Sequence, residues 1–381
     1  MYQLPKIKSY VPKEYDKYED VNRLILIGNG FDLAHGLKSS FKDFIFDYCF
    51  QVLKRLFSNL EYKDLFIKLN FIRASELFDE TEFNLTLENA FYKFNEVINN
   101  KNIGVQWKSA FFKRVLFDVE KFNWVDIELI YFHFLKQDYT LNNKESLDQL
   151  NLQLNFLKKL FLEYLQNQLN FHTYIVSQEI LDQFQQHIKI SDVIPETLKG
   201  KKKPKNYCIL NFNYTNIAEK YSNEFHSQYI PIHGELNSEN STKQAPVFGY
   251  GDELDRDYIK FESHKDESVF EHIKSFKYLQ YNHYRNLIEF IESKPFQVQI
   301  FGHSCGLSDR TLLNTIFENE NCISIKTFYY RWGEYGEFDD FEQKSYAISR
   351  HFKSKSDLRI KVVNKERCET MFQPNLKNNN Q

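Results

Sequence analysis

One stretch near the start of the chain limits the possible folds more than any other. The aliphatic run Arg23-Leu-Ile-Leu-Ile27 enters a turn with two glycines, and a helical pattern of apolar residues begins after Ser39-Ser40. This is the plan of a buried parallel strand, a ligand-binding loop and a helix capped by a serine. The loop is therefore predicted to form the floor of a nucleotide pocket. Its predicted binding residues are Gly28, Asn29, Gly30 and Asp32.

This loop does not carry a complete phosphate-binding motif. It has G-x-G without the third glycine of a dinucleotide fingerprint, and no GxxxxGK[ST] sequence occurs in the chain. Two interpretations stay open: the N–H groups of the loop face a phosphate, or the loop is a tight strand-to-helix turn with Asp32 as a cap. Because Asp32 would repel a phosphate, we expect it to bind ribose hydroxyls or to orient another side chain.

The residue pattern divides the chain into two parts. Residues 60–195 contain one glycine, have no proline before Pro195 and keep helical spacing of apolar residues, which predicts a large α-helical insertion. Strands and helices alternate on both sides of it, as is typical of α/β proteins. We therefore predict a Rossmann-like, doubly wound parallel sheet built from residues 1–59 and 196–381, with the insertion at 60–195.

The second half of the sheet is predicted in more detail. We expect Thr215 or Asn216, and then Ser308, to cap helices. The expected strands are 207–211, 229–232, 296–301, 323–330 and 358–363, and the expected helices are about 264–294, 309–319 and 338–352.

Unusual residues gather where these strands end. Eight of the 12 glycines lie there, which in a glycine-poor chain suggests that the backbone approaches a ligand closely. In parallel sheets, ligands bind outside the carboxyl ends of the strands. The further predicted binding residues are Tyr214, Gly249, Gly302, His303, Ser304 and Asp309.

Asn213 and His233 form the best catalytic pair in the sequence. An asparagine amide can hold a sugar hydroxyl or a water molecule, and a histidine can take a proton near neutral pH. A structural imidazole bonded to a carbonyl is the alternative for His233, but its place at the end of an apolar strand favours a site residue. His303 and Ser304 are a second candidate pair. Their sequence is not G-x-S-x-G, which argues against a serine hydrolase.

One acidic motif lies in the insertion, at Trp124-Val-Asp126-Ile-Glu128. Two acids that are two positions apart on a helix do not share a face. We therefore predict a core tryptophan with exposed acids at this point.

Composition narrows the possible functions. A net charge of −3 gives no general attraction for nucleic acid, and the basic run at 199–205 is expected to be a solvated linker rather than a phosphate-binding patch. The five cysteines are scattered, so neither zinc nor disulfides are expected. No long apolar run indicates a signal peptide or a membrane span, so we expect a cytoplasmic protein without a membrane partner.

Six segments together resemble the AbiH family of bacterial abortive-infection proteins, which act in phage defence. They occur in the family's order over residues 22–320: LILIGNGFDLAHGL, WVDIE, LNFNYTN, IHGEL, VFGYG and IFGHSCGLSD. The resemblance leaves a phage-derived trigger and a homo-oligomer open as partners.

The same series is similar to a divergent sirtuin-like NAD-binding domain. The matching positions are Gly28-Asn29-Gly30, Asn213-Tyr214, His233-Gly234, and Gly302-His303-Ser304 with Asp309. This resemblance implies that Asn213 and His233 are catalytic, that NAD is the substrate, and that its nicotinamide–ribose bond is cleaved without a metal. Two alternatives remain: a nucleotide-binding sensor without turnover, and a nuclease or other hydrolase using Asp32, His233 and His303.

Overall fold

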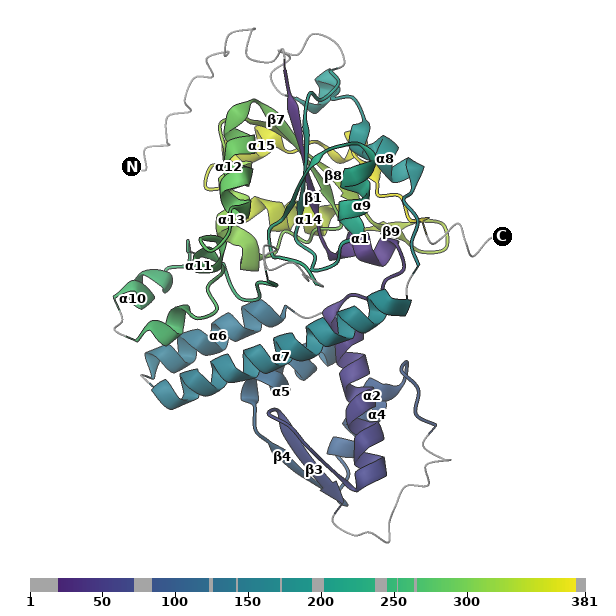
Figure 1. Ribbon diagram of the computed structural model, residues 1–381, viewed down its shortest axis with the longest axis vertical. Coiled ribbons are helices and arrows are strands. Elements are labelled where there is room, and N and C mark those ends of the chain that lie inside the picture. The colour runs from purple at the N-terminus through teal and green to yellow at the C-terminus, as the bar shows by residue number, and fades with distance from the viewer. Residues whose placement is uncertain are drawn as a thin grey trace, which may run out of the picture.

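The computed structural model describes residues 20–71, 84–122, 126–141, 143–171, 173–193, 202–236, 245–251, 253–263 and 266–374. The described chain forms two parts. The part with the main sheet lies in the upper half of Figure 1, and the mostly helical part lies in the lower half. Residues 1–19, Trp124 and residues 199–201 of the basic run lie outside the described residues.

Six parallel strands form the main sheet, in the order β11-β8-β7-β1-β5-β6. The chain builds outward from β1 in one direction through β5 and β6, and then in the other direction through β7, β8 and β11. This is the order of doubly wound nucleotide-binding sheets, and it reverses between β1 and β7. The predicted α/β class with a parallel sheet is confirmed. The strands are β1 (Asn22–Ile27), β5 (Tyr207–Asn211), β6 (Gln228–Pro231), β7 (Phe296–Phe301), β8 (Cys322–Tyr329) and β11 (Glu369–Thr370).

Both faces of this sheet are covered by helices. All six residues of β1 are buried because successive side chains point to opposite faces and both faces carry a hydrophobic core. Leu24 and Leu26 pack with α12 (His283–Ser293), α13 (Arg310–Phe317) and α14 (Phe341–Ser349). Ile25 and Ile27 pack with α1 (Asn29–Ala34), α8 (Gln178–Gln185) and α9 (Ile217–Glu224).

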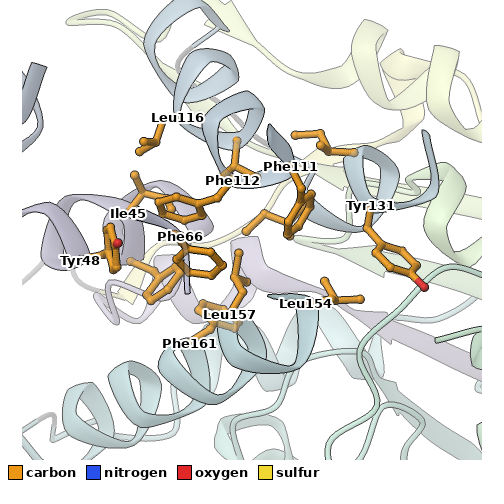
Figure 2. Packing of buried hydrophobic residues seen from close by; sticks show 14 of the residues in the cluster. Ile45, Tyr48, Phe66, Phe111, Phe112, Leu116, Tyr131, Leu154, Leu157 and Phe161 are labelled. Atoms are coloured by element: carbon orange, nitrogen blue, oxygen red, sulfur yellow. The ribbon is translucent and has the colours of Figure 1, made fainter. Parts of the chain in front are cut away.

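The second part has its own hydrophobic core. Phe66 and Phe112 stack with ring centroids 4.0 Å apart, and Phe161 of the long helix α7 packs on the same cluster (Figure 2). The helices are α2 (Phe41–Asn59), α4 (Ala90–Ile98), α5 (Ala110–Phe122), α6 (Ile127–Thr140) and α7 (Lys144–Phe171). Helix α2 precedes the predicted boundary at 59/60 but buries its apolar face in this core, and the boundary itself stays a prediction.

Two sequence expectations for this part have different outcomes. Ser40 caps α2 in a capping box with Asp43, as predicted. The expectation of helices alone is wrong, because three short strands form an antiparallel sheet in the order β2-β3-β4. Strands this short give too few alternating positions to stand out from a helical pattern. They are β2 (Glu61–Lys63), β3 (Ile67–Phe71) and β4 (Ile103–Trp107).

Several predictions for the last third need correction. The single helix expected at about 264–294 is broken into η4 (Glu267–Phe270), α11 (Lys274–Tyr278) and α12. The strand expected at 358–363 is helix α15 (Lys355–Lys361), because the side chain of Ser354 caps the N–H of Asp357 and starts a helix there. The remaining short elements are η3 (Ile190–Asp192), α10 (Tyr258–Glu262), η5 (Leu307–Asp309), β9 (Arg331–Trp332), β10 (Phe338–Asp339) and η6 (Lys365–Arg367).

The predicted helix caps near the site are confirmed only in part, because Asn216 occupies the N-cap position of α9 but the expected side-chain cap bonds are not made. Neither Thr215 nor Asn216 makes a side-chain cap bond to α9, and Thr215 instead binds Asp32. Ser308 lies within η5, and α13 begins after Asp309 without a side-chain cap bond. Thr215 and Ser308 line the cavity at the edge of the sheet instead of capping the helices that follow them.

Candidate functional site

A cavity of about 600 Å³ lies at the carboxyl edge of the sheet, where the strand order reverses. Helices α6 and α7 cross beneath the sheet part (Figure 1), and both contribute residues to the cavity wall. Eleven of the twelve predicted site residues line it: Gly28, Asn29, Gly30, Asp32, Asn213, Tyr214, His233, Gly302, His303, Ser304 and Asp309. Gly249 does not line the cavity, but its N–H donates to Oε1 of Glu128, which does, at 2.9 Å.

The glycines of the first loop serve close packing between two strand-end loops. The N–H of Gly30 donates to the carbonyl of Gly302 at 2.9 Å, and that of Gly28 donates to Phe301 at 3.0 Å. Gly302 has a φ of +66°, and a Cβ built there would lie 2.1 Å from the backbone nitrogen of Phe31. Because these N–H groups are already bonded within the protein, the geometry favours the tight-turn interpretation over a phosphate cradle. Helix α1 starts directly at Asn29, so Asp32 lies inside this helix and does not cap it.

Asp32 holds Asn213 in place. Its Oδ1 accepts a hydrogen bond from Asn213 Nδ2 at 2.9 Å, and its Oδ2 accepts one from Thr215 Oγ1 at 2.6 Å. Burial raises the pKa of Asp32 to about 7, against the lowering effect of these two bonds. Of the roles predicted for Asp32, orienting another side chain is the one that the geometry supports.

The amide of Asn213 is fixed with one end toward the cavity. Its Nδ2 donates to the Gly28 carbonyl at 3.1 Å and to Asp32, which uses both amide hydrogens. No described residue donates a hydrogen bond to its Oδ1. The side chain can therefore accept a bond from a hydroxyl of a ligand without having to rotate.

The ring of His233 is held on both sides. Nδ1 lies 3.1 Å from the carbonyl of Phe212, which can only accept, so this nitrogen carries a hydrogen. Nε2 lies 3.1 Å from the Tyr278 hydroxyl and also 3.1 Å from Asp309 Oδ1. The side chain is 5% exposed, so His233 combines features of a buried structural histidine with a place in the cavity wall.

His303 is a neutral part of the wall. Its Nδ1 accepts the N–H of Cys305 at 3.0 Å, so the hydrogen of the neutral ring is on Nε2, which faces Asp309 Oδ2 at 3.8 Å. Burial lowers the pKa of His303 to about 3, although Asp309 acts in the opposite direction. Its ring lies against Phe212 with centroids 4.1 Å apart.

A buried ion-pair network that the sequence did not predict joins the two parts of the protein. Lys274 Nζ lies 2.8 Å from Glu128 Oε2 and 2.8 Å from Asp309 Oδ1, and its residue is 1% exposed. Burial alone would lower the pKa of Lys274 and raise that of Asp309, but their attraction shifts both pKa values the other way. Lys274 fell inside the predicted polar helix, and nothing in its local sequence marks it as a site residue.

The prediction of exposed acids at Asp126 and Glu128 is wrong. Asp126 is the N-cap of α6 and Glu128 lies in the first turn, so the rule for two positions within a helix does not apply to them. Both line the cavity, and Glu128 is only 8% exposed. Burial, and then the charge of Glu128, raise the pKa of Asp126 to about 6.

Within the described part of the chain, no helix is long and apolar enough to cross a membrane. The same part contains no group of three or more His, Cys, Asp or Glu residues placed to hold a metal ion. Its five cysteines are free and buried.

The chain matches no curated protein. A family model described as Bacteriophage abortive infection AbiH matches residues 24–331. This span covers most of the chain and includes the glycine loop, both catalytic candidates, Asp126 and Lys274. The chain therefore belongs to the AbiH family of bacteriophage abortive-infection proteins.

Proposed function

We propose that this protein acts in abortive infection by hydrolysing NAD at the nicotinamide–ribose bond in the cavity at the sheet edge. The observation that carries the proposal is the clamp of Asp32 on Asn213, which leaves the amide oxygen of Asn213 toward the cavity. The clamp joins the ends of β1 and β5, and the cavity it faces extends to the ends of β1 and β7, where the strand order reverses and where doubly wound sheets bind nucleotides. A cavity of about 600 Å³ lies within the usual range for small-molecule sites.

The charges around the cavity suit this reaction. Cleavage of an N-glycosidic bond gives the ribose oxocarbenium character, and fixed negative groups stabilise a positive charge as it develops. Asp126, Glu128 and Asp309 line the wall close to the buried Lys274, while the buried Lys344 lies at His303 and pairs with Asp340. Nicotinamide leaves as a neutral molecule once its ring nitrogen receives the bonding electrons, so the leaving group needs no acid.

Each predicted catalytic residue has a role in this proposal. The amide oxygen of Asn213 accepts a hydrogen bond from a ribose hydroxyl and orients the sugar. The attacking water must lose a proton, and the cavity wall offers His233 and Asp126 as acceptors. The sirtuin-like resemblance assigns this role to His233.

A nucleotide-binding sensor without turnover is a second candidate. The observation that favours it is that Asp32, His233, His303 and Asp309 already make contacts with other protein groups, so they are less available for chemistry on a ligand. The same internal contacts argue against a nuclease that uses Asp32, His233 and His303 as catalytic residues. Neither oxygen of Asp32 is without a partner, and burial keeps His303 neutral.

Nicotinamide release from NAD by the purified full chain and by infected cells tests the proposal. Asn213→Ala should abolish release, while Asn216→Ala, three positions away and outside the cavity wall, should keep it. Release by Asn213→Ala at the normal rate would contradict the proposed site. Denatured protein that yields a bound nucleotide, without release before or during infection, would favour the sensor.

A further inference from the structure

Asp126 differs from the other carboxylates of the cavity wall. As the N-cap of α6 it uses one oxygen, since Oδ1 accepts the N–H of Leu129 at 2.9 Å. No described residue donates a hydrogen bond to its Oδ2. One oxygen of this carboxylate therefore has a structural role, and the other is available at the cavity.

Asp32, Glu128, Asp309 and His233, which also line the wall, are held by protein partners. Both oxygens of Asp32 and of Glu128 accept hydrogen bonds from protein groups. Asp309 contacts Lys274 and His233 through Oδ1 and faces His303 through Oδ2. His233 would have to give up its contact with Tyr278 before Nε2 could take a proton from a bound water.

A small space lies beside Asp126 Oδ2. A Cβ built on Gly306 would lie 3.7 Å from Asp126 Oδ2, from Ser304 Oγ and from Ser308 Oγ. Because Gly306 has no side chain, no methyl group on this residue crowds a water molecule that binds Asp126 Oδ2. The two hydroxyls can each donate to and accept from such a water, while the carboxylate can only accept.

We propose that Asp126 is a further catalytic residue: the general base that takes a proton from the water attacking C1′ of the ribose. The proposal rests on the proposed NAD hydrolysis. The water oxygen bonds to C1′, the bond from C1′ to the nicotinamide nitrogen breaks, and its electrons stay on that nitrogen. The proton moves from the water to Asp126 Oδ2 and then to solvent. The products are ADP-ribose, nicotinamide and one proton.

The electrostatic surroundings agree with this role. The charged groups that face Asp126 are Glu128 on α6, Lys274 on α11 and Asp309 on η5. Burial and the two carboxylates raise its pKa, against the effects of Lys274 and the Leu129 N–H, and the result is about 6. Such a base is ionised at neutral pH and still basic enough to accept a proton. Turnover should therefore fall as the pH drops through about 6, when Asp126 becomes protonated.

Asp126→Asn separates the catalytic role from the structural one. Asparagine caps a helix as well as aspartate does, but its amide cannot take a proton. We expect kcat for nicotinamide release to fall by roughly 100-fold or more, with KM changed by less than about 3-fold and with the acidic limb of the pH profile lost. Asp266→Asn is the matched control, because Asp266 caps η4 through the N–H of Ser268, away from the cavity.

Azide provides the second readout. As an anionic nucleophile it needs no base, so it should restore nicotinamide release in Asp126→Asn and give the azide of ADP-ribose as product. If Asp126→Asn does not fold, Asp126→Ser is the replacement, because serine also caps helices and is no base. Normal kcat in Asp126→Asn, or a loss that azide does not restore, overturns the role of Asp126 alone. A wild-type chain that releases no nicotinamide before or during infection overturns the proposed hydrolysis and this role together.

Discussion

Asp32 Oδ1 lies 2.9 Å from Asn213 Nδ2, although 181 positions separate the two residues in the chain. The bond links the end of β1 to the end of the neighbouring strand β5. It fixes the direction of the Asn213 amide together with the carbonyl of Gly28 in the glycine loop, which accepts the second amide hydrogen. The orientation of the predicted catalytic amide therefore depends on the carboxylate of Asp32, each oxygen of which accepts a hydrogen bond within the protein.

Replacement of Asp32 by alanine should release this amide. Without the acceptor, the Asn213 side chain can rotate and its oxygen no longer faces the ribose in a fixed direction, so we expect kcat to fall at least 10-fold. Thr215→Ala removes only the other bond to Asp32 and should reduce kcat less. Steady-state nicotinamide release by both variants shows which loses more kcat. Equal losses would argue against the proposal that Asp32 orients the Asn213 amide.

The same carboxyl should make stability depend on pH. Burial, partly offset by the bonds from Thr215 and Asn213, raises the pKa of Asp32 from 3.8 to about 7, so between these pH values the folded chain binds more protons than the unfolded chain. Its contribution to the free energy of unfolding therefore falls by about 4 kcal/mol as the pH rises from about 4 to 7. Urea unfolding of wild type and Asp32→Asn at pH 5 and pH 8 measures this. The stability gap between the two proteins should change with pH, and parallel behaviour would refute the expected shift.

Removal of the buried charge of Lys274 should lower the free energy of unfolding strongly. Lys274→Met leaves Glu128 without its ion-pair partner and Asp309 with His233 alone, and both carboxylates are buried, so we expect the free energy of unfolding to fall by about 3–5 kcal/mol. Lys136→Met is the control, since its pairs with Asp255 and Asp257 are partly exposed and should contribute about 1 kcal/mol or less.

The measurement is the free energy of unfolding in urea at neutral pH. Addition of Glu128→Gln to Lys274→Met removes one of the two stranded charges and should recover part of the loss. Similar losses for the two lysine variants would mean that burial does not strengthen the network.

Substitution of two glycines near the cavity by alanine should affect stability very differently. Gly302→Ala places a methyl group 2.1 Å from the backbone nitrogen of Phe31 at a φ of +66°, so the two loops must separate and we expect a loss of more than about 3 kcal/mol. Gly306→Ala meets its neighbours only at 3.7 Å, so the protein should fold normally. Thermal unfolding of both variants tests this contrast.

Gly306→Ala also has a functional consequence. Its methyl group would lie 3.7 Å from Asp126 Oδ2 and would crowd a water molecule bound to that oxygen, so nicotinamide release should fall in a folded protein. Unchanged release by this variant would place the attacking water elsewhere in the cavity.

The sequence determined five of the six strands of the main sheet, all but β11, and the predicted half of the site, because these are encoded locally. An aliphatic run that ends in a polar or glycine pair marks one parallel strand, and parallel strands bring their carboxyl ends to the same edge. That reasoning placed Asp32, Asn213, His233 and Asp309 in one cavity from patterns a few residues long.

Only the tertiary structure decided the charged half of the site. Lys274 and Glu128 are 146 positions apart, and each looks like an ordinary surface residue in its own segment. Asp126 enters the wall because α6 begins at the edge of the sheet, so its cap and first turn face the cavity rather than solvent. Burial turns these residues into a paired network and a carboxylate with a raised pKa, and burial is a property of how the two parts of the chain pack against each other.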